Sequence, residues 1–326
     1  MQNKENKFGF SSKRKIEFEL NIKIILICAT VILSLFTCKS SKSKSPIISS
    51  TRTIINHSDS AFIANAIESL DTANLPLITV QVNIHFVGNR NGNFYPGKAS
   101  DEKYTNGLFW SEKLIGHANH VWRSLEASST SRKNYLGNAR LQFKIYTESQ
   151  NTEDKYQGVW FWDNINQVKR YYQEKVLNII LHDTGRPKSE QLSGIACGLN
   201  MCNELSLNGA YDNAANGGKF GWWSFAGTLN HEFGHICGLC HAFYCDNECK
   251  DIDLDVAKEC HTAPCFNDCG GPNSGVCKCW DTGTKNMMGY NASGTALTPC
   301  QWKIMMRNLC FSKAEYIIKN FRSPKN

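Results

Sequence analysis

The stretch that decides the fold runs from residue 231 to residue 241 and reads His231-Glu232-Phe233-Gly234-His235-Ile236-Cys237-Gly238-Leu239-Cys240-His241. His231 and His235 are four residues apart, so on a helix their side chains lie on one face, about one turn apart. Two imidazoles in that arrangement can hold one metal ion between them. We therefore predict a helix that ends near Gly238 and carries two metal ligands.

A third ligand is predicted directly after this helix. A straight helix would carry His241 away from the first two histidines, but Gly238 can adopt a positive φ without steric cost, so the chain is expected to turn there and bring His241 back. Three protein ligands leave a fourth tetrahedral position open, which distinguishes a catalytic zinc site from a closed structural one. The predicted cofactor is zinc, held by His231, His235 and His241.

Glu232 directly follows the first ligand and is expected to reach a water molecule on the metal. Zinc lowers the pKa of such a water to about 7 and polarises the carbonyl that the water attacks. Glu232 is therefore the predicted general base, which takes a proton from the water and passes it to the leaving amine. Two alternatives stay open: a zinc-stabilised surface binding or adhesion lipoprotein without turnover, and hydrolysis of a non-peptide amide.

The long histidine motif and residues 286–290, Asn-Met-Met-Gly-Tyr, together resemble the metzincin family of zinc metallopeptidases. The resemblance implies that Met288 lies under the zinc and that Tyr290 approaches the zinc or the oxyanion. It also implies that the substrate is a peptide or protein, bound in a cleft between two subdomains. By the same analogy, residues 196–198 or 205–210 form the sheet edge along which the substrate lies.

Within the metzincins, the chain is most similar to the pappalysin-like branch. Residues 238–243, Gly-Leu-Cys-His-Ala-Phe, and residues 297–301, Leu-Thr-Pro-Cys-Gln, carry this similarity, which spans roughly residues 77–312. That branch has an acidic, calcium-binding stretch after the third histidine. The residues that match it only loosely here are Asp251, Asp253, Asp255 and Pro264. Calcium is thus a second expected cofactor.

Hydrophobic patterns outside the motif predict an α+β fold. Apolar and polar residues alternate from Ile78 to Phe86, which is typical of a strand, whereas apolar residues between Leu114 and Leu125 have helical spacing. Residues 141–145 and 176–181 are two further predicted strands, giving the order strand, helix, strand, helix, strand. The expected architecture is a metzincin-type zincin, a twisted mixed sheet with two long helices and a disulfide-rich lower subdomain with a C-terminal helix.

The C-terminal helix and the cysteines define that lower subdomain. Thr298, Pro299 and Gln301 have the residue types of an N-cap, a first-turn proline and a capping-box glutamine. Of 15 cysteines, all but Cys28 and Cys38 lie between residues 197 and 310. Clustered cysteines in an exported chain predict disulfides, and Cys237 and Cys240 are expected to tie the end of the zinc helix to nearby loops.

The N-terminus predicts export. A basic segment precedes a largely apolar stretch of 13 residues from Ile24 to Phe36, which is shorter than the roughly 20 residues of a membrane-spanning helix. Leu-Phe-Thr before Cys38 resembles a lipobox, so the protein is expected in the cell envelope, anchored through a lipid on Cys38, or secreted. Residues 1–37 carry six basic and three acidic side chains, and their removal lowers the formal charge from +7 to +4, which indicates no nucleic-acid partner.

Four segments are predicted from these features. Residues 1–38 form a signal peptide, and the polar residues that follow make 39–76 a tether or a short pro-segment. Residues 77–241 form the upper catalytic subdomain with the zinc helix, and residues 242–326 form the lower subdomain with the methionine turn.

Overall fold

The computed structural model describes residues 57–87, 106–126, 136–148, 151–182, 194–208, 222–243, 249–252, 285–289 and 294–320. The chain divides into two units, Met1–Arg52 and Thr53–Asn326, and every described residue belongs to the second. Within the described ranges, no helix combines the length and the apolar character that crossing a membrane requires.

A seven-stranded sheet forms the centre of the fold, with the path β2-β1-β4-β6-β5 and two further strands, β3 and β7, paired to β1. The strands are β1 (Leu77–Val87), β2 (Leu141–Ile145), β3 (Val159–Trp162), β4 (Leu177–His182), β5 (Gly194–Ala196), β6 (Glu204–Asn208) and β7 (Ile317–Asn320). The long strand β1 borders β2 and β7 along its first half and β3 and β4 along its second half. Because β5 and β7 are antiparallel to their neighbours while the other pairs are parallel, the sheet is mixed, as predicted.

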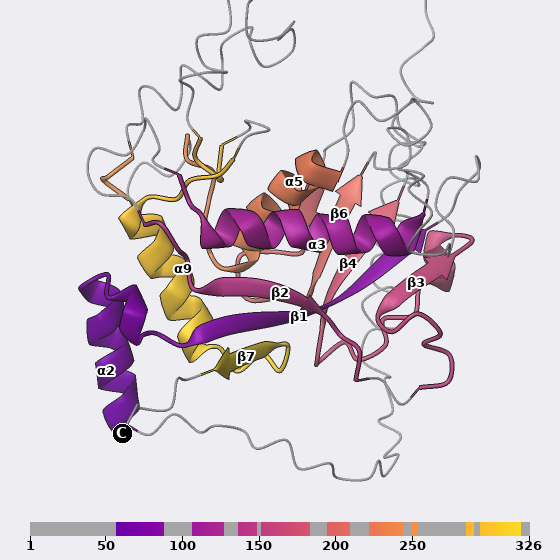
Figure 1. Cartoon of the computed structure of the whole chain (residues 1–326), viewed down its shortest axis with the longest axis horizontal. Coiled ribbons are helices and arrows are strands. Elements are labelled where there is room, and N and C mark those ends of the chain that lie inside the picture. The colour runs from indigo at the N-terminus through magenta and orange to yellow at the C-terminus, as the bar shows by residue number, and fades with distance from the viewer. Residues whose placement is uncertain are drawn as a thin grey trace, which may run out of the picture. The chain divides into compact units, whose positions relative to one another are not determined.

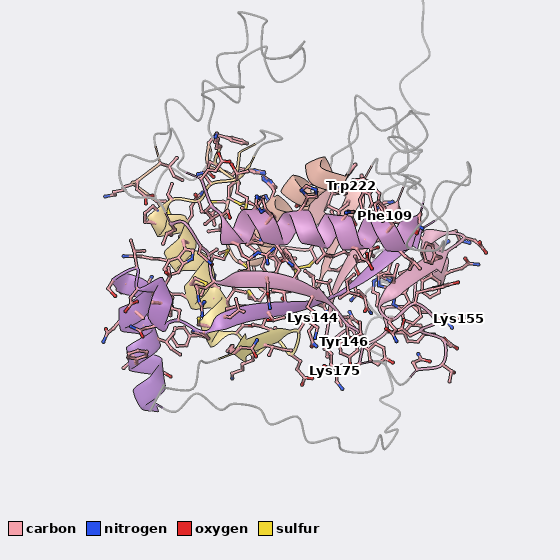
Figure 2. The ribbon with its side chains drawn as sticks, in the orientation of Figure 1. Phe109, Lys144, Tyr146, Lys155, Lys175 and Trp222 are labelled. Atoms are coloured by element: carbon pink, nitrogen blue, oxygen red, sulfur yellow. A yellow bond between two sulfur atoms is a disulfide. The ribbon has the colours of Figure 1, made fainter. Side chains whose placement is uncertain are left out.

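Two long helices, α3 (Gly107–Arg123) and α5 (Trp222–Ile236), cover one face of the sheet (Figure 1). Alternate residues of β1, including Ile84 and Phe86, point into this face and join one buried core with the apolar sides of both helices. Phe109 of α3 meets Trp222 at the start of α5, with ring centroids 5.6 Å apart (Figure 2). The predicted strand over residues 78–86 and the predicted helix over residues 114–125 are thus confirmed.

The other face of β1 is buried as well, although it carries polar residues such as Asn83 and His85. Figure 2 shows Lys144, Tyr146 and Lys175 on this side of the sheet, away from α3. The helix predicted between the strands 141–145 and 176–181 is wrong: the described residues there hold β3 and the short 3-10 helix η2 (Ile165–Gln167). The segment around β3 is apolar on both faces, because its alternate side chains meet both buried layers, so it gave no alternating pattern.

The C-terminal helix α9 (Pro299–Phe311) begins at the predicted capping box. The Thr298 side chain accepts from the Gln301 N–H, and the Gln301 side chain accepts from the Thr298 N–H. Helix α2 (His57–Glu68) contacts α9 and buries Ile63 and Ile67. Part of the segment predicted as a tether or pro-segment, residues 39–76, is therefore packed helix, followed by the 3-10 helix η1 (Thr72–Asn74).

Two disulfides join pairs of cysteines that both lie in the described residues. Cys197–Cys202 closes the loop between β5 and β6, and Cys249–Cys300 joins the segment after the third histidine to the start of α9. The second bond lies in the part of the chain where a disulfide-rich subdomain is predicted. Since β7 pairs with β1, the end of that part also contributes a strand to the main sheet.

Candidate metal centre

Helix α5 positions the first two histidines. Its buried side, which includes Leu229 and Phe233, packs into the core, and the Phe233 ring meets that of Phe143 with centroids 5.0 Å apart. This packing fixes the rotation of the helix about its axis. His231 and His235 consequently lie on the opposite side, one turn apart, with 3.1 Å between their Nε2 atoms.

The turn after α5 brings in the third histidine. Gly238 has a φ of +91°, and its N–H donates to the His235 carbonyl at 2.8 Å. A Cβ on Gly238 would lie 2.6 Å from Asn308 Nδ2, so a larger residue would displace the hydrogen bond from this amide to the Cys237 carbonyl. His241 Nε2 then lies 3.1 Å from His235 Nε2, and the His241 ring is stacked on Phe243.

The three histidines fit a metal ion, because one ring nitrogen of each lies close to those of the other two. His231 Nδ1 and His235 Nδ1 lie 2.7 Å from the carbonyl oxygens of Met287 and Leu239. A carbonyl only accepts, so both Nδ1 atoms carry the proton and both Nε2 atoms present a lone pair. Ligand atoms of all three rings lie within 4.8 Å of one another. Burial lowers the pKa of His231 to about 4, which keeps this ring in the neutral form that binds metals.

Glu232 lies beside this group and is almost fully buried, with 7 % of its surface exposed. Burial raises its pKa to about 7, opposed by a hydrogen bond from the Ala196 backbone N–H. Strand β5 is in close contact with it, since a Cβ on Gly194 would lie 2.6 Å from Cγ and Oε1 of Glu232. The carboxyl group is therefore placed by the edge strand as well as by its own helix, and it is poised to exchange a proton near neutral pH.

Met288 lies directly beneath the helix that carries the histidines. It is completely buried, and a Cβ on Gly234 would lie 2.5 Å from its Sδ atom. The turn around it is fixed from two sides, because the Met288 carbonyl accepts from Ala242 N at 2.9 Å and Asn286 Oδ1 accepts from Met288 N at 2.9 Å. Asn286 in turn bonds the capping-box residue Gln301, which links the floor of the site to α9.

Some predicted site residues cannot be compared with the structure. Tyr290 and Cys38 lie outside the described residues, as do Asp253, Asp255 and Pro264 of the loosely matched calcium stretch. Asp251 is described, and its Oδ2 accepts from Cys300 N at 2.9 Å, which caps the start of α9. The structure thus gives Asp251 a helix-capping contact, and calcium stays a prediction.

The cysteines near the site differ in state. Cys240 forms a disulfide, in agreement with its predicted role at the helix end, whereas Cys237 is free and buried, so the prediction for it is wrong. In the described part of the chain, one other cluster has the spacing of a metal site: Cys249, Asp251 and Cys300. Its two sulfurs are bonded to each other, which removes them as ligands.

Sequence reasoning missed the backbone groups that orient the site. The carbonyls of Met287 and Leu239 and the N–H of Ala196 have no residue-type signature, because any amino acid supplies them. Among the residues around these groups, Gly194 is the one whose type gives a signal: it is a glycine, and the strand comes too close to Glu232 there for a side chain.

A family profile and solved structures are similar to this chain. The family profile Peptidase M43, described as pregnancy-associated plasma protein-A, matches residues 146–310. No curated protein matches the chain. Mature mirolysin of Tannerella forsythia in complex with a cleaved peptide has 19% identity and a TM-score of 0.44, over 73% of this chain and 93% of that one. A mutant of Tannerella forsythia promirolysin has 18% identity and a TM-score of 0.43, over 78% and 88%.

Proposed function

The chain belongs to the Peptidase M43 family and is a metallopeptidase with peptide or protein substrates, and from this premise we propose that it is a zinc-dependent endopeptidase of the metzincin type. The observation that carries the proposal is the convergence of three imidazole Nε2 atoms beside a buried carboxyl group. His231, His235 and His241 would hold the ion. Nitrogen ligands of this number suit zinc with one open coordination position.

The chemistry divides between the ion and the chain. A bound zinc supplies Lewis acidity, which makes a water molecule more acidic and polarises the scissile carbonyl. Glu232 accepts the proton of the attacking water and delivers it to the leaving amine, a role that suits a carboxyl group whose pKa lies near 7. The hydrogen bonds from His231 and His235 to backbone carbonyls hold the two rings in the orientation that ligation needs. Tyr290 is our candidate for stabilising the oxyanion, on the strength of the family resemblance.

The test uses purified residues 39–326, because α2 packs on α9 and a shorter chain that starts at residue 77 would lose this contact. The protein is incubated with a mixed peptide library, with and without a chelator, beside Glu232→Ala. We expect cleavage by the wild type, loss of cleavage with chelator, recovery with zinc, and a fall of about 10²–10⁴-fold in Glu232→Ala. A wild type that holds one zinc per chain yet cleaves nothing would favour the alternative of a binding or adhesion protein.

We also propose that the protein is exported and anchored in the cell envelope by a lipid on Cys38. The N-terminal sequence pattern supports this, and so do the disulfides Cys197–Cys202 and Cys249–Cys300, which form in oxidising surroundings. Cell fractionation tests it: Cys38→Ser should move the protein from the membrane fraction to the soluble exported fraction. If the wild-type protein is recovered from the medium without a lipid, it is secreted and the proposed lipid anchor is wrong.

A further inference from the structure

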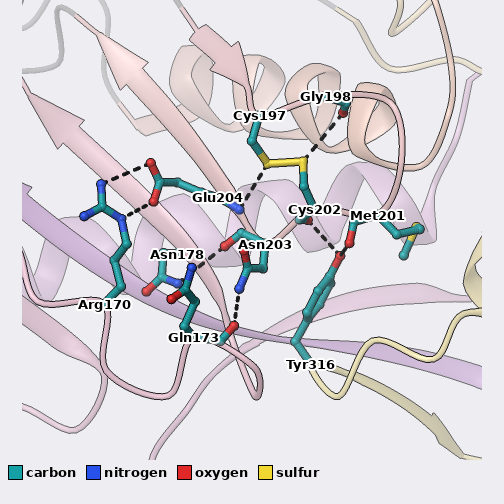
Figure 3. The surroundings of a disulfide bond; sticks show 10 residues. All are labelled: Arg170, Gln173, Asn178, Cys197, Gly198, Met201, Cys202, Asn203, Glu204 and Tyr316. Atoms are coloured by element: carbon teal, nitrogen blue, oxygen red, sulfur yellow. Dashed lines mark hydrogen bonds and ion pairs between the residues drawn. A yellow bond between two sulfur atoms is a disulfide. The ribbon is translucent and has the colours of Figure 1, made fainter. Parts of the chain in front are cut away.

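The loop between β5 and β6 connects the edge of the sheet to the general base. Strand β5 has three residues and pairs with β6 on one side, so few backbone hydrogen bonds define its place. The disulfide Cys197–Cys202 joins the two ends of the loop, at the point where β5 ends and β6 is about to begin (Figure 3). A covalent bond therefore ties the short edge strand to its neighbour.

Strand β6 is a firm support for this bond. Arg170 forms an ion pair with Glu204, and Asn203 donates to the Gln173 carbonyl, so the start of β6 is held by the segment beneath the sheet (Figure 3). The Asn178 N–H of β4 donates to the Asn203 carbonyl at 2.9 Å. The position of Cys202 is thereby fixed from the interior of the sheet.

The loop is also anchored to the end of the zinc helix. Met201 N donates to the carbonyl of Ile236, the last residue of α5, at 2.9 Å. The Tyr316 hydroxyl lies 2.9 Å from the carbonyl oxygens of both Met201 and Cys202 (Figure 3). Met201 has a φ of +57°, a conformation that a side-chain-bearing residue keeps only when its surroundings impose it.

Strand β5 itself, directly before Cys197, meets Glu232 on the same helix. The Ala196 N–H donates to the Glu232 carboxyl group, and Gly194 lies too close to it to allow a side chain. Strand β5 and the loop after it thus contact helix α5 at two points, Ala196 at Glu232 and Met201 at Ile236. A displacement of β5 would move the donor that holds the carboxyl group.

We propose that Cys197 and Cys202 are positioning residues for peptide hydrolysis, because their disulfide holds the Ala196 N–H on the carboxyl group of Glu232. This inference rests on the role proposed above for Glu232. It assigns no ligand or proton transfer to the cysteines themselves. Misplacement of a catalytic group by about 1 Å can cost on the order of 10²-fold in rate.

The test is the double variant Cys197→Ala/Cys202→Ala in the full exported chain. We expect kcat for a fluorogenic peptide to fall by about 10- to 100-fold while the chain keeps one zinc and an unchanged zinc affinity. Amide hydrogen exchange at Ala196 should become faster, both in this variant and in Glu232→Ala, which removes the acceptor. Unchanged kcat, or unchanged exchange at Ala196 in the double variant, would overturn the proposal.

Two further variants separate positioning from general stability. Cys249→Ala/Cys300→Ala removes the other described disulfide, and it should lower the unfolding temperature while leaving Ala196 exchange and the kcat of the folded protein unchanged. Tyr316→Phe keeps the disulfide but removes the hydroxyl that holds the loop, and a fall of about 2- to 5-fold in kcat is expected. An equal fall in kcat for both double variants would mean that the loop acts only through stability.

The same measurements distinguish this inference from the proposed function. A wild type that binds zinc but cleaves no peptide contradicts the endopeptidase role. Exchange at Ala196 still decides whether the disulfide holds the strand on Glu232, since that measurement needs no turnover.

Discussion

His231 and His85 lie on opposite sides of the sheet, and burial lowers the pKa of each ring to about 4. Their hydrogen bonds are nevertheless reversed. His231 carries its proton on Nδ1, toward a carbonyl, and its Nε2 faces two other histidines. At His85 the Trp162 Nε1–H donates to Nδ1, so the proton is on Nε2 and points at Asn178 Oδ1, 2.9 Å away.

The difference shows what identifies a ligand. Both rings are neutral at pH 7, so a depressed pKa alone does not separate a metal site from a structural hydrogen-bond network. At His85 both ring nitrogens have side-chain partners, and the ring is completely buried, with Trp160 and Trp162 as neighbours at centroid distances of 6.3 and 6.2 Å. At the metal centre, one nitrogen of each ring is directed to a shared point.

The largest expected effect comes from replacing His231 and His85 by asparagine, each in a separate variant. His231→Asn should abolish stoichiometric zinc binding and lower kcat/KM by about 10³-fold or more, because a bound metal contributes several kcal/mol to transition-state stabilisation. His85→Asn should keep its zinc and its activity per folded molecule, and lose stability instead. Zinc content, kinetics and urea unfolding measured side by side check this contrast. Loss of zinc from His85→Asn would contradict the assignment of His85 to a structural role.

Acid should act next most strongly, through His85. Burial is the main cause of its lowered pKa, opposed by the hydrogen bond to Asn178 and aided by Arg170. The unfolded ring binds a proton below about pH 6.5 but the folded ring only near pH 4, so the stabilisation is complete above pH 6.5 and is lost as the pH falls toward 4. A shift of this size corresponds to a loss of about 3 kcal/mol. Urea unfolding of zinc-free protein at pH 7.5 and 4.5 should show a smaller acid effect in His85→Asn than in the wild type.

Trp162→Phe should cost less, about 1–2 kcal/mol, because it leaves His85 Nδ1 buried without a donor. With that nitrogen free to accept a proton, the pKa of the folded ring should rise toward 6.5, so the acid-induced loss of stability should become smaller and end at a higher pH. Trp160→Phe is the matched control, since the Trp160 Nε1 has no hydrogen-bond partner within the described structure. An equal shift of the acid transition in both variants would contradict the assignment of the His85 proton to Nε2.

The smallest effect is expected from His117 and His120, which are exposed on α3. The double change to glutamine should alter the free energy of unfolding by less than about 0.5 kcal/mol and leave zinc content and activity unchanged. Isothermal titration with zinc is a sensitive check, and a second binding site lost in this variant would show that exposed histidines also bind metal here.

How far the sequence predicts this molecule depends on how local the responsible interactions are. The spacing of His231, Glu232 and His235 has meaning within one helix turn, and the capping box at Thr298 lies within four residues, so both could be predicted from short stretches. The partners of His85, in contrast, are 93 and 77 residues away, and no periodicity links them. The sequence showed His85 only as a polar residue on a strand.

Three other features could not be predicted from the sequence, for related reasons. Strand β3 contacts both layers, so it lacks the alternation that indicates a strand, and an incorrect helix was predicted in its region. Helix α2 follows a polar stretch, although Ile63, Ala66 and Ile67 have helical spacing and are buried. The pairing of Cys197 with Cys202 requires the loop geometry, because cysteine spacing alone leaves many pairings open.

The pairing of β7 with β1 has a consequence for the order in which the protein folds. Thr79 of the first strand and Asn320 of the last are bonded side chain to side chain across 241 residues of chain. Contacts over such a separation form late, because a long loop must close first. During synthesis, β1 therefore cannot complete its pairing until residues 317–320 have been made. A chain stopped before residue 317 would leave one side of the first part of β1 unpaired and open to association with other chains.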